Sequence, residues 1–143
     1  MVEVESLIEC GVEIIALDAT KRVRPGGISL NEFFQSIRHK YPNQLFMADC
    51  SSTEEGITAA NIGFDLIGTT MAGYTDYTKG RSIPPYDMIQ ELVKTCGKPV
   101  VAEGNISTPA QLRQAMDLGI PAAIVGSAIT RPLDITKKFI EVL

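Results

Sequence analysis

Three apolar runs each end in an acidic residue, although a buried strand ordinarily carries no charge. Asp18 ends IIALD, Asp49 ends LFMAD and Glu103 ends VVAE. A carboxyl group that is half-buried in this way has its pKa raised towards neutrality, so it can exchange protons at cellular pH. One such acid could serve as a helix cap or an ion-pair partner, but three of them favour a functional site.

The chain around these acids alternates between two kinds of segment. Continuous apolar runs, typical of strands buried on both faces, cover residues 14–19, 45–50, 66–70, 99–104 and 122–127. Segments with helical spacing and helix-end signals cover residues 1–11, 29–41, 52–63, 85–97, 107–119 and 134–143. The alternation predicts a parallel α/β sheet, either open and doubly wound or closed as a (β/α)8 barrel. Both architectures bind ligands at the carboxyl ends of their strands, where the three acids lie.

Two glycine-containing turns follow the last two apolar runs. Gly104 and Asn105 begin the first, and Gly126 and Ser127 begin the second. Each turn opens a predicted helix and offers backbone N–H groups to an anion, although either could also be a plain tight turn. Barrels often bind phosphate with the loops after their last two strands, and Arg131, just past the second turn, could clamp such a phosphate.

Composition excludes several other classes of function. The net charge of −4 gives no basic surface and argues against a nucleic-acid partner. No apolar stretch approaches the roughly 18 residues of a membrane span, and the acidic N-terminus is unlike a signal peptide, so we expect a cytoplasmic protein without a membrane partner. The chain has one histidine, and its cysteines lack metal-binding spacing, so no metal is expected. Cys10, Cys50 and Cys96 are expected to be buried, reduced thiols.

Five linked segments, in order along the whole chain, resemble the N-acylmannosamine-6-phosphate 2-epimerase family. They are ALDATKRVRP, MADCSSTEEG, GFDLIGTTMAGYT, VVAEGNISTPAQ and AAIVGSAITRP. The resemblance implies a (β/α)8 barrel of the TIM-barrel type and a role in bacterial amino-sugar (sialic acid) breakdown. It implies an isomerase that interconverts N-acetylmannosamine 6-phosphate and N-acetylglucosamine 6-phosphate, with a phosphorylated amino sugar as ligand and no metal or organic cofactor.

The same resemblance assigns roles to individual residues. Glu103 matches the catalytic-site glutamate and Asp49 an active-site aspartate. The phosphate-binding end matches Gly104, Asn105, Gly126, Ser127 and Arg131, and the polar positions of the substrate cleft match Asp18, Thr69, Thr70 and Tyr74. Epimerisation at C2 removes a proton beside a carbonyl and returns one to the other face, so it needs acid–base groups and a donor for the enolate oxygen. Arg22 and Arg24 are either cleft residues or solvated loop charges.

The chain departs from the family pattern in its number of strands. A barrel has eight strands in about 250 residues, whereas this chain of 143 residues has five apolar runs. The resemblance makes residues 1–143 a single partial phosphate-binding barrel domain, corresponding to strands 4–8 and lacking the family's catalytic lysine. A fragment, a truncated gene product and half of a split enzyme all remain open.

Open barrel edges favour association, so we expect a homodimer or a complementing N-terminal barrel fragment. Three other functions remain: a catalytically incomplete sugar-phosphate binder, another phosphate-binding barrel enzyme, and an inert remnant.

Overall fold

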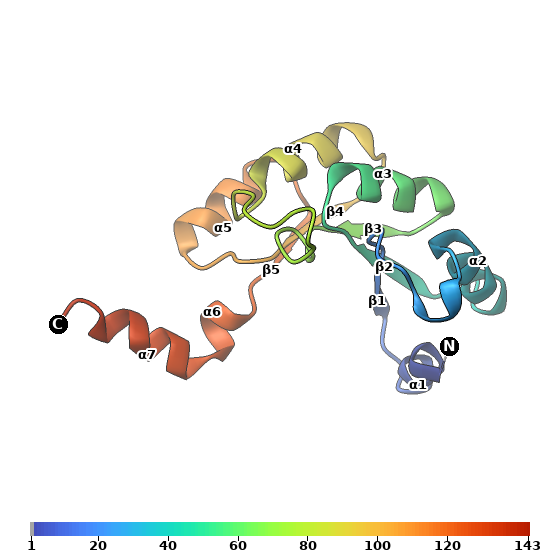
Figure 1. The fold of residues 1–143 in the computed structure, drawn as a ribbon, viewed down its shortest axis with the longest axis horizontal. Coiled ribbons are helices and arrows are strands. Elements are labelled where there is room, and N and C mark those ends of the chain that lie inside the picture. The colour runs from blue at the N-terminus through green and yellow to red at the C-terminus, as the bar shows by residue number, and fades with distance from the viewer. Residues whose placement is uncertain (1) are drawn as a thin grey trace.

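The computed structural model describes residues 2–143 and shows a parallel sheet whose crossover helices lie along one side (Figure 1). The strands are β1 (Ile14–Asp18), β2 (Leu45–Asp49), β3 (Leu66–Gly68), β4 (Val100–Glu103) and β5 (Ala122–Ile124). The helices are α1 (Val2–Glu9), α2 (Leu30–Lys40), α3 (Thr53–Ile62), α4 (Tyr86–Thr95), α5 (Pro109–Met116), α6 (Ser127–Thr130) and α7 (Pro132–Ile140), with a short 3-10 turn η1 (Pro25–Gly27).

The strand order settles which parallel architecture the chain adopts. The strands pair in the order β1-β2-β3-β4-β5, and every pair is parallel. A doubly wound sheet reverses its strand order and carries helices on both faces. A sequential sheet with helices on one face is instead the arrangement of a (β/α)8 barrel. The predicted parallel strands are confirmed, and the doubly wound alternative is wrong.

Capping side chains determine where three of the helices begin. Ser29, Ser52 and Thr108 each accept a hydrogen bond from the backbone N–H three residues later, and the side chain at that later position bonds back to the cap. α3 then ends at Gly63 in the left-handed conformation, with φ 106°. Of the described helices, none is long and apolar enough to cross a membrane.

An aromatic cluster fills the space between the sheet and its helices. Phe34 of α2 stacks on Phe64, with ring centroids 3.9 Å apart, and meets the edge of Phe46 of β2 at 5.7 Å. All three rings are fully buried, and Ile15 and Ile67 extend the same layer along the sheet. This core holds the strands in the register that places the carboxyl ends of β1 and β2 side by side.

The opposite face of the sheet, which we call the inner face, includes Ile14, Ala16, Leu45, Ala122 and Ile124. It carries no helix among the described residues (Figure 1), and its side chains Ile14, Leu45 and Ile124 are 41–45% exposed. The continuous apolar runs predicted burial on both faces. That prediction holds for most of β2, β3 and β4 and is wrong for β1 and β5, because no neighbouring layer covers the inner face at the sheet edges.

The C-terminal segment differs from the single helix predicted for residues 134–143. α6 ends at Thr130, and α7 starts at Pro132, where the missing N–H of proline suits a first helical position. α7 extends away from the sheet and its helices (Figure 1), and Leu133 and Phe139 are 67% and 73% exposed. The end of the chain therefore presents an amphipathic helix that contacts α6 and leaves apolar side chains such as Leu133 and Phe139 exposed.

The three cysteines are all free thiols, but they differ in burial. Cys50 is buried and Cys96 is partly buried, as predicted. Cys10 is exposed, and the prediction of a buried thiol is wrong there because Cys10 follows the last residue of α1, beyond Val4 and Ile8, which pack on the core.

Candidate active site at the carboxyl edge of the sheet

The strand register brings the three acids to one face of the sheet. Asp18 pairs with Asp49, and Asp49 pairs with Gly68. Gly68 pairs in turn with Val101, which lies two residues before Glu103. Paired residues point to the same side of a sheet, as do alternate residues of one strand. All three carboxyl groups therefore lie at the carboxyl edge of the inner face.

A threonine hydroxyl connects two of these acids. Thr70 Oγ1 donates a hydrogen bond to Asp49 Oδ1 at 2.6 Å and lies 3.2 Å from Glu103 Oε2. Thr70 follows β3, which runs between the strands of the two acids. The two predicted catalytic carboxyl groups are thus joined through one side chain.

Both linked acids hold protons more tightly than ordinary carboxyl groups. Burial raises the pKa of Glu103, a hydrogen bond donated by Thr70 would lower it, and the negative charge of Asp49 raises it further. Burial also raises the pKa of Asp49, with a smaller contribution from Asp18. A half-buried acid with a raised pKa is suited to proton exchange.

An open cavity of about 520 Å³ lies beside Glu103. Its walls come from the ends of β4 and β5 and from the loops after β1 and β3. They are formed by Arg22, Thr70, Met71, Tyr74, Glu103, Gly104, Asn105, Ile106, Ile124, Gly126 and Ser127. The wall therefore combines one carboxyl group, one guanidinium group and several hydroxyl and backbone groups, and it contains no lysine. Nowhere in residues 2–143 do three side chains of His, Cys, Asp or Glu gather as ligands for a metal ion.

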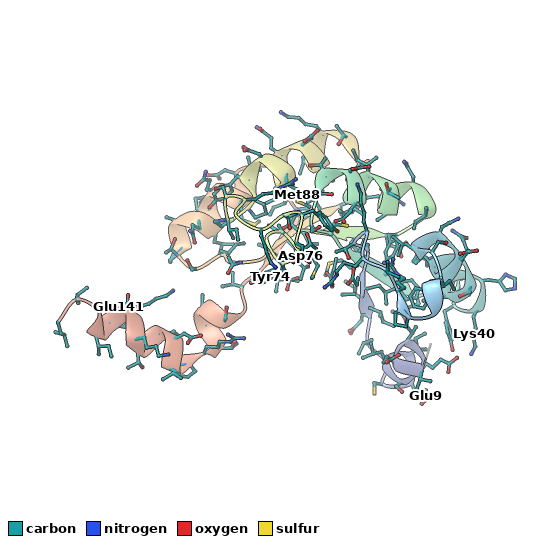
Figure 2. The ribbon with its side chains drawn as sticks, viewed as in Figure 1. Glu9, Lys40, Tyr74, Asp76, Met88 and Glu141 are labelled. Atoms are coloured by element: carbon teal, nitrogen blue, oxygen red, sulfur yellow. The ribbon has the colours of Figure 1, made fainter. Side chains whose placement is uncertain are left out.

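The turn after Glu103 has an unusual backbone. Gly104 has φ 103° and Asn105 has φ 57°, so two successive residues occupy the left-handed region. Asparagine tolerates this region better than most residues with a side chain. Asn105 Nδ2 donates to the hydroxyl oxygen of Tyr74 at 3.0 Å. Figure 2 shows Tyr74 on the loop between β3 and α4, so this contact joins two walls of the cavity.

Asp18 is held by its own loop. Its carboxylate accepts hydrogen bonds from the backbone N–H and the hydroxyl of Thr20 at 2.8 and 2.6 Å, and it pairs with Arg22. Burial opposes ionisation of Asp18, but these bonds outweigh it and hold its pKa below the ordinary value. Arg24 donates to the backbone carbonyl of Asp18 at 2.5 Å. Arg22 and Arg24 are therefore structural partners of Asp18, and Arg22 also faces the cavity.

Four predicted site residues do not line the cavity: Asp18, Asp49, Thr69 and Arg131. Asp49 reaches it only through Thr70. Arg131 is exposed between α6 and α7, with its guanidinium 3.7 Å from the carboxylate of Asp134. Pro132 starts α7 directly after it, so the arginine follows the departing helix.

Glu55 is the main feature of this edge that the sequence analysis did not assign. Its side chain is 2% exposed and accepts hydrogen bonds from the backbone N–H groups of Lys21, Ser51 and Ser52 and from the hydroxyls of Ser51 and Tyr77. Burial opposes its ionisation, but the bonds from Tyr77, Ser51 and Lys21 hold its pKa below the ordinary value. One carboxylate thus binds the loops after β1, β2 and β3. The Ser52–Glu55 spacing of a capping box was its only signal in the sequence.

The sequential parallel sheet and the cavity at its carboxyl edge define a protein of the (β/α)8-barrel type. The family described as "Putative N-acetylmannosamine-6-phosphate epimerase" matches residues 1–143, and the chain belongs to that family. Two curated relatives are both called "Putative N-acetylmannosamine-6-phosphate 2-epimerase". The relative from Caldanaerobacter subterraneus is 47% identical over 140 residues, which are 98% of this chain and 59% of the relative. The relative from Clostridium perfringens strain SM101 is 48% identical over 143 residues, which are 100% of this chain and 64% of the relative.

Solved structures agree with this assignment. The N-acetylmannosamine-6-phosphate 2-epimerase from Clostridium perfringens superposes with a TM-score of 0.88 at 47% identity, over 98% of this chain and 60% of that one. A thiamine phosphate pyrophosphorylase from Pyrococcus furiosus shares the fold, with a TM-score of 0.64 at 21% identity over 94% of this chain and 59% of that one. The chain thus spans about three fifths of the length of the curated relatives it matches.

Proposed function

We propose that the chain carries the carboxyl-edge site of an isomerase that interconverts N-acetylmannosamine 6-phosphate and N-acetylglucosamine 6-phosphate. Family membership supports this activity. The observation that carries the proposal is Glu103, a half-buried acid with a raised pKa in the wall of a cavity of about 520 Å³. We place the reaction in the cytoplasm, because its substrate is a phosphorylated metabolite. We assign it to amino-sugar (sialic acid) breakdown.

In this proposal Glu103 handles the protons of the sugar. Removing the C2 proton from the open-chain form gives an enolate, and returning a proton to the opposite face gives the other epimer. Glu103 exchanges a proton with the substrate, and Asp49 acts on Glu103 through Thr70. The hydroxyl group of Tyr74, which also lines the cavity, is a donor available to substrate oxygens.

The phosphate is assigned to the part of the cavity wall formed by the turns after β4 and β5. Gly104, Asn105, Gly126 and Ser127 belong to these turns and carry backbone N–H groups. Arg131 completes the clamp when it leaves Asp134, because a guanidinium binds phosphate oxygens in a bidentate manner. The proposal needs no metal or organic cofactor, since carboxyl and hydroxyl groups suffice for proton exchange beside a carbonyl.

The missing wall of the site comes from other βα units in this proposal. β1 and β5 are the two ends of the sheet, and the inner face beside them exposes Ile14, Leu45 and Ile124. A complementing N-terminal barrel fragment would pair with both edges and cover these side chains. A homodimer is the other arrangement, and sedimentation analysis of the purified chain distinguishes it from a monomer that awaits a partner.

A second candidate function is a sugar-phosphate binder without catalytic activity. It is favoured by one observation, that no lysine lines the cavity among the residues described. Such a protein would bind N-acetylmannosamine 6-phosphate in a phosphate-dependent manner without exchanging its C2 proton.

Proton exchange at C2 tests both candidates. The purified chain is incubated with N-acetylmannosamine 6-phosphate in heavy water, and the C2 signal is followed by NMR. The isomerase proposal expects loss of the C2 proton signal and growth of the gluco epimer, both abolished in Glu103→Gln. Glu141→Gln makes the same change at the exposed end of α7 and serves as the control (Figure 2). Binding without exchange by a folded chain would support the binder, and full activity in Glu103→Gln would contradict the catalytic role.

A further inference from the structure

The hydroxyl of Thr70 lies in a space that Gly68, two residues earlier at the end of β3, leaves open. A Cβ atom on Gly68 would lie 3.1 Å from Thr70 Oγ1 and 3.4 Å from Asp49 Oδ1. The first distance is tighter than ordinary packing, so a side chain at Gly68 would displace the hydroxyl of Thr70. Glycine at this position thus permits the 2.6 Å contact between Thr70 and Asp49.

Counting protons fixes the direction of the hydrogen bonds. A threonine hydroxyl has one proton to donate and lone pairs to accept with, whereas an ionised carboxylate can only accept. The 2.6 Å distance is typical of a hydroxyl that donates to a carboxylate, so the proton of Thr70 belongs to Asp49. At 3.2 Å, Glu103 Oε2 then faces a lone pair of Thr70 and bonds to it only when Glu103 itself is protonated.

We propose that Thr70 is a positioning residue that assigns the single proton of this pair to Glu103 and keeps Asp49 ionised. This inference deepens the proposed function, because it specifies that Glu103 enters the reaction protonated and returns this proton to C2, so that a separate base takes the C2 proton from the opposite face. Ionised Glu103 loses its partner at Thr70 and faces the charge of Asp49, so deprotonation directs its carboxylate away from Thr70.

The surrounding charges agree with this assignment. Asp18 on β1 pairs with Arg22 in its own loop, and its remaining charge acts on Asp49. From the loop after β3, Tyr74 contributes a hydroxyl that accepts from Asn105. Burial and the Asp49 charge both raise the pKa of Glu103, and a Thr70 hydroxyl that donated to Glu103 would oppose them. Among these neighbours, Asp49 is therefore the charge that Glu103 meets through Thr70.

Carboxyl ¹³C NMR titration of the full chain tests the proposal without requiring activity. In the unmodified chain, the Glu103 carbon is expected to titrate at higher pH than the Asp49 carbon. In Thr70→Val, Asp49 loses its donor and Glu103 loses its acceptor. The titration of Asp49 should then move to higher pH and that of Glu103 to lower pH. Thr70→Ser keeps the hydroxyl and should restore the original order.

Two results would overturn the proposal. The first is an increase in the Glu103 titration midpoint in Thr70→Val with Asp49 unmoved, because Thr70 would then have been donating to Glu103. The second is an Asp49 midpoint above that of Glu103 in the unmodified chain, which decides the question even if Thr70→Val does not fold. Thr95→Val makes the same change on the exposed side of α4 and should leave both midpoints in place. An absence of C2 exchange would count against the proposed function but not against this titration order.

Discussion

Thr69 and Glu103 hold each other through two reciprocal hydrogen bonds. Thr69 Oγ1 donates to the carbonyl oxygen of Glu103 at 2.8 Å, and the backbone N–H of Glu103 donates to Thr69 Oγ1 at 3.0 Å. The register of β3 and β4 ends at Gly68 and Val101, so a side chain satisfies the next backbone groups. Thr69 thus fixes the backbone of the candidate acid, while Thr70, its neighbour, contacts the side chain.

Replacing Thr69 by valine should loosen Glu103. The substitution keeps the shape of a fully buried side chain but leaves the N–H and C=O of Glu103 without partners. We expect a loss of about 1–2 kcal/mol in the free energy of unfolding, measured by urea denaturation. Thr69→Ser retains the hydroxyl and should recover most of the loss. Equal stability of the valine variant and the unmodified chain would show that the reciprocal bonds contribute nothing.

Glu55→Gln should weaken the attachment of three loops. A buried amide cannot accept five hydrogen bonds as a carboxylate does, so we expect a loss of about 1.5–3 kcal/mol at neutral pH. Because the folded-state pKa of Glu55 is lowered, its contribution is fully present above the unfolded value of 4.5. It disappears as the pH falls through the lower folded-state pKa.

The measurement for Glu55 is a series of urea unfolding curves between neutral and acidic pH. The difference between the unmodified chain and the variant should shrink below the unfolded value of 4.5. Glu54→Gln is a matched control, since Glu54 is the exposed neighbour on the same helical turn. A pH-independent difference, or an equal loss in the control, would argue against an ionised Glu55 at the centre of the network.

Glu103→Gln should stabilise the fold at neutral pH. The pKa of Glu103 is raised in the folded state, so ionisation makes the native state less favourable as the pH rises above the unfolded value of 4.5. Glutamine has no such ionisation cost, and single stabilising substitutions commonly add about 0.5–2 kcal/mol to the free energy of unfolding. Thermal melts should show the gain in stability at neutral pH, and the gain should disappear below the unfolded-state pKa of 4.5. A variant that melts lower than the unmodified chain at neutral pH would contradict this expectation.

Arg131→Gln should weaken binding of N-acetylmannosamine 6-phosphate if Arg131 clamps the phosphate. A charged hydrogen bond contributes about 1.5–3 kcal/mol, so the dissociation constant should rise about 10- to 100-fold in calorimetric titrations. Arg113→Gln is the matched control, because Arg113 is another exposed arginine in an ion pair, with Asp117 on α5. Arg22 lines the cavity. A large loss of affinity in Arg22→Gln with none in Arg131→Gln would show that Arg22, and not Arg131, binds the phosphate.

The sequence predicted the positions of the strands better than it predicted which of their faces are buried. Apolar runs located all five strands, and parallel topology then placed Asp49 and Glu103 on one edge. The same runs could not show that Ile14 and Ile124 lie on an uncovered face, because apolar character says nothing about which neighbouring layer is present. Burial depends on such neighbours as much as on composition.

The missed parts of the site depend on contacts between distant residues. Glu55 bonds to Lys21 and to Tyr77, which are 34 and 22 positions away in the sequence. No local spacing reports such contacts. Arg131 lies outside the cavity wall for a local reason, since Pro132 starts a separate helix and turns the chain outward.

The network around Glu55 also limits how this protein can be redesigned. The loops of a (β/α)8 scaffold are commonly exchanged one at a time, because each joins one strand to one helix. Here three successive loops share one buried acceptor through Lys21, Ser51 and Tyr77. A transplanted loop that lacks a donor at the equivalent position would leave Glu55 short of a partner and disturb the two loops beside it. These three loops should therefore be transferred to another scaffold together with Glu55, as one unit.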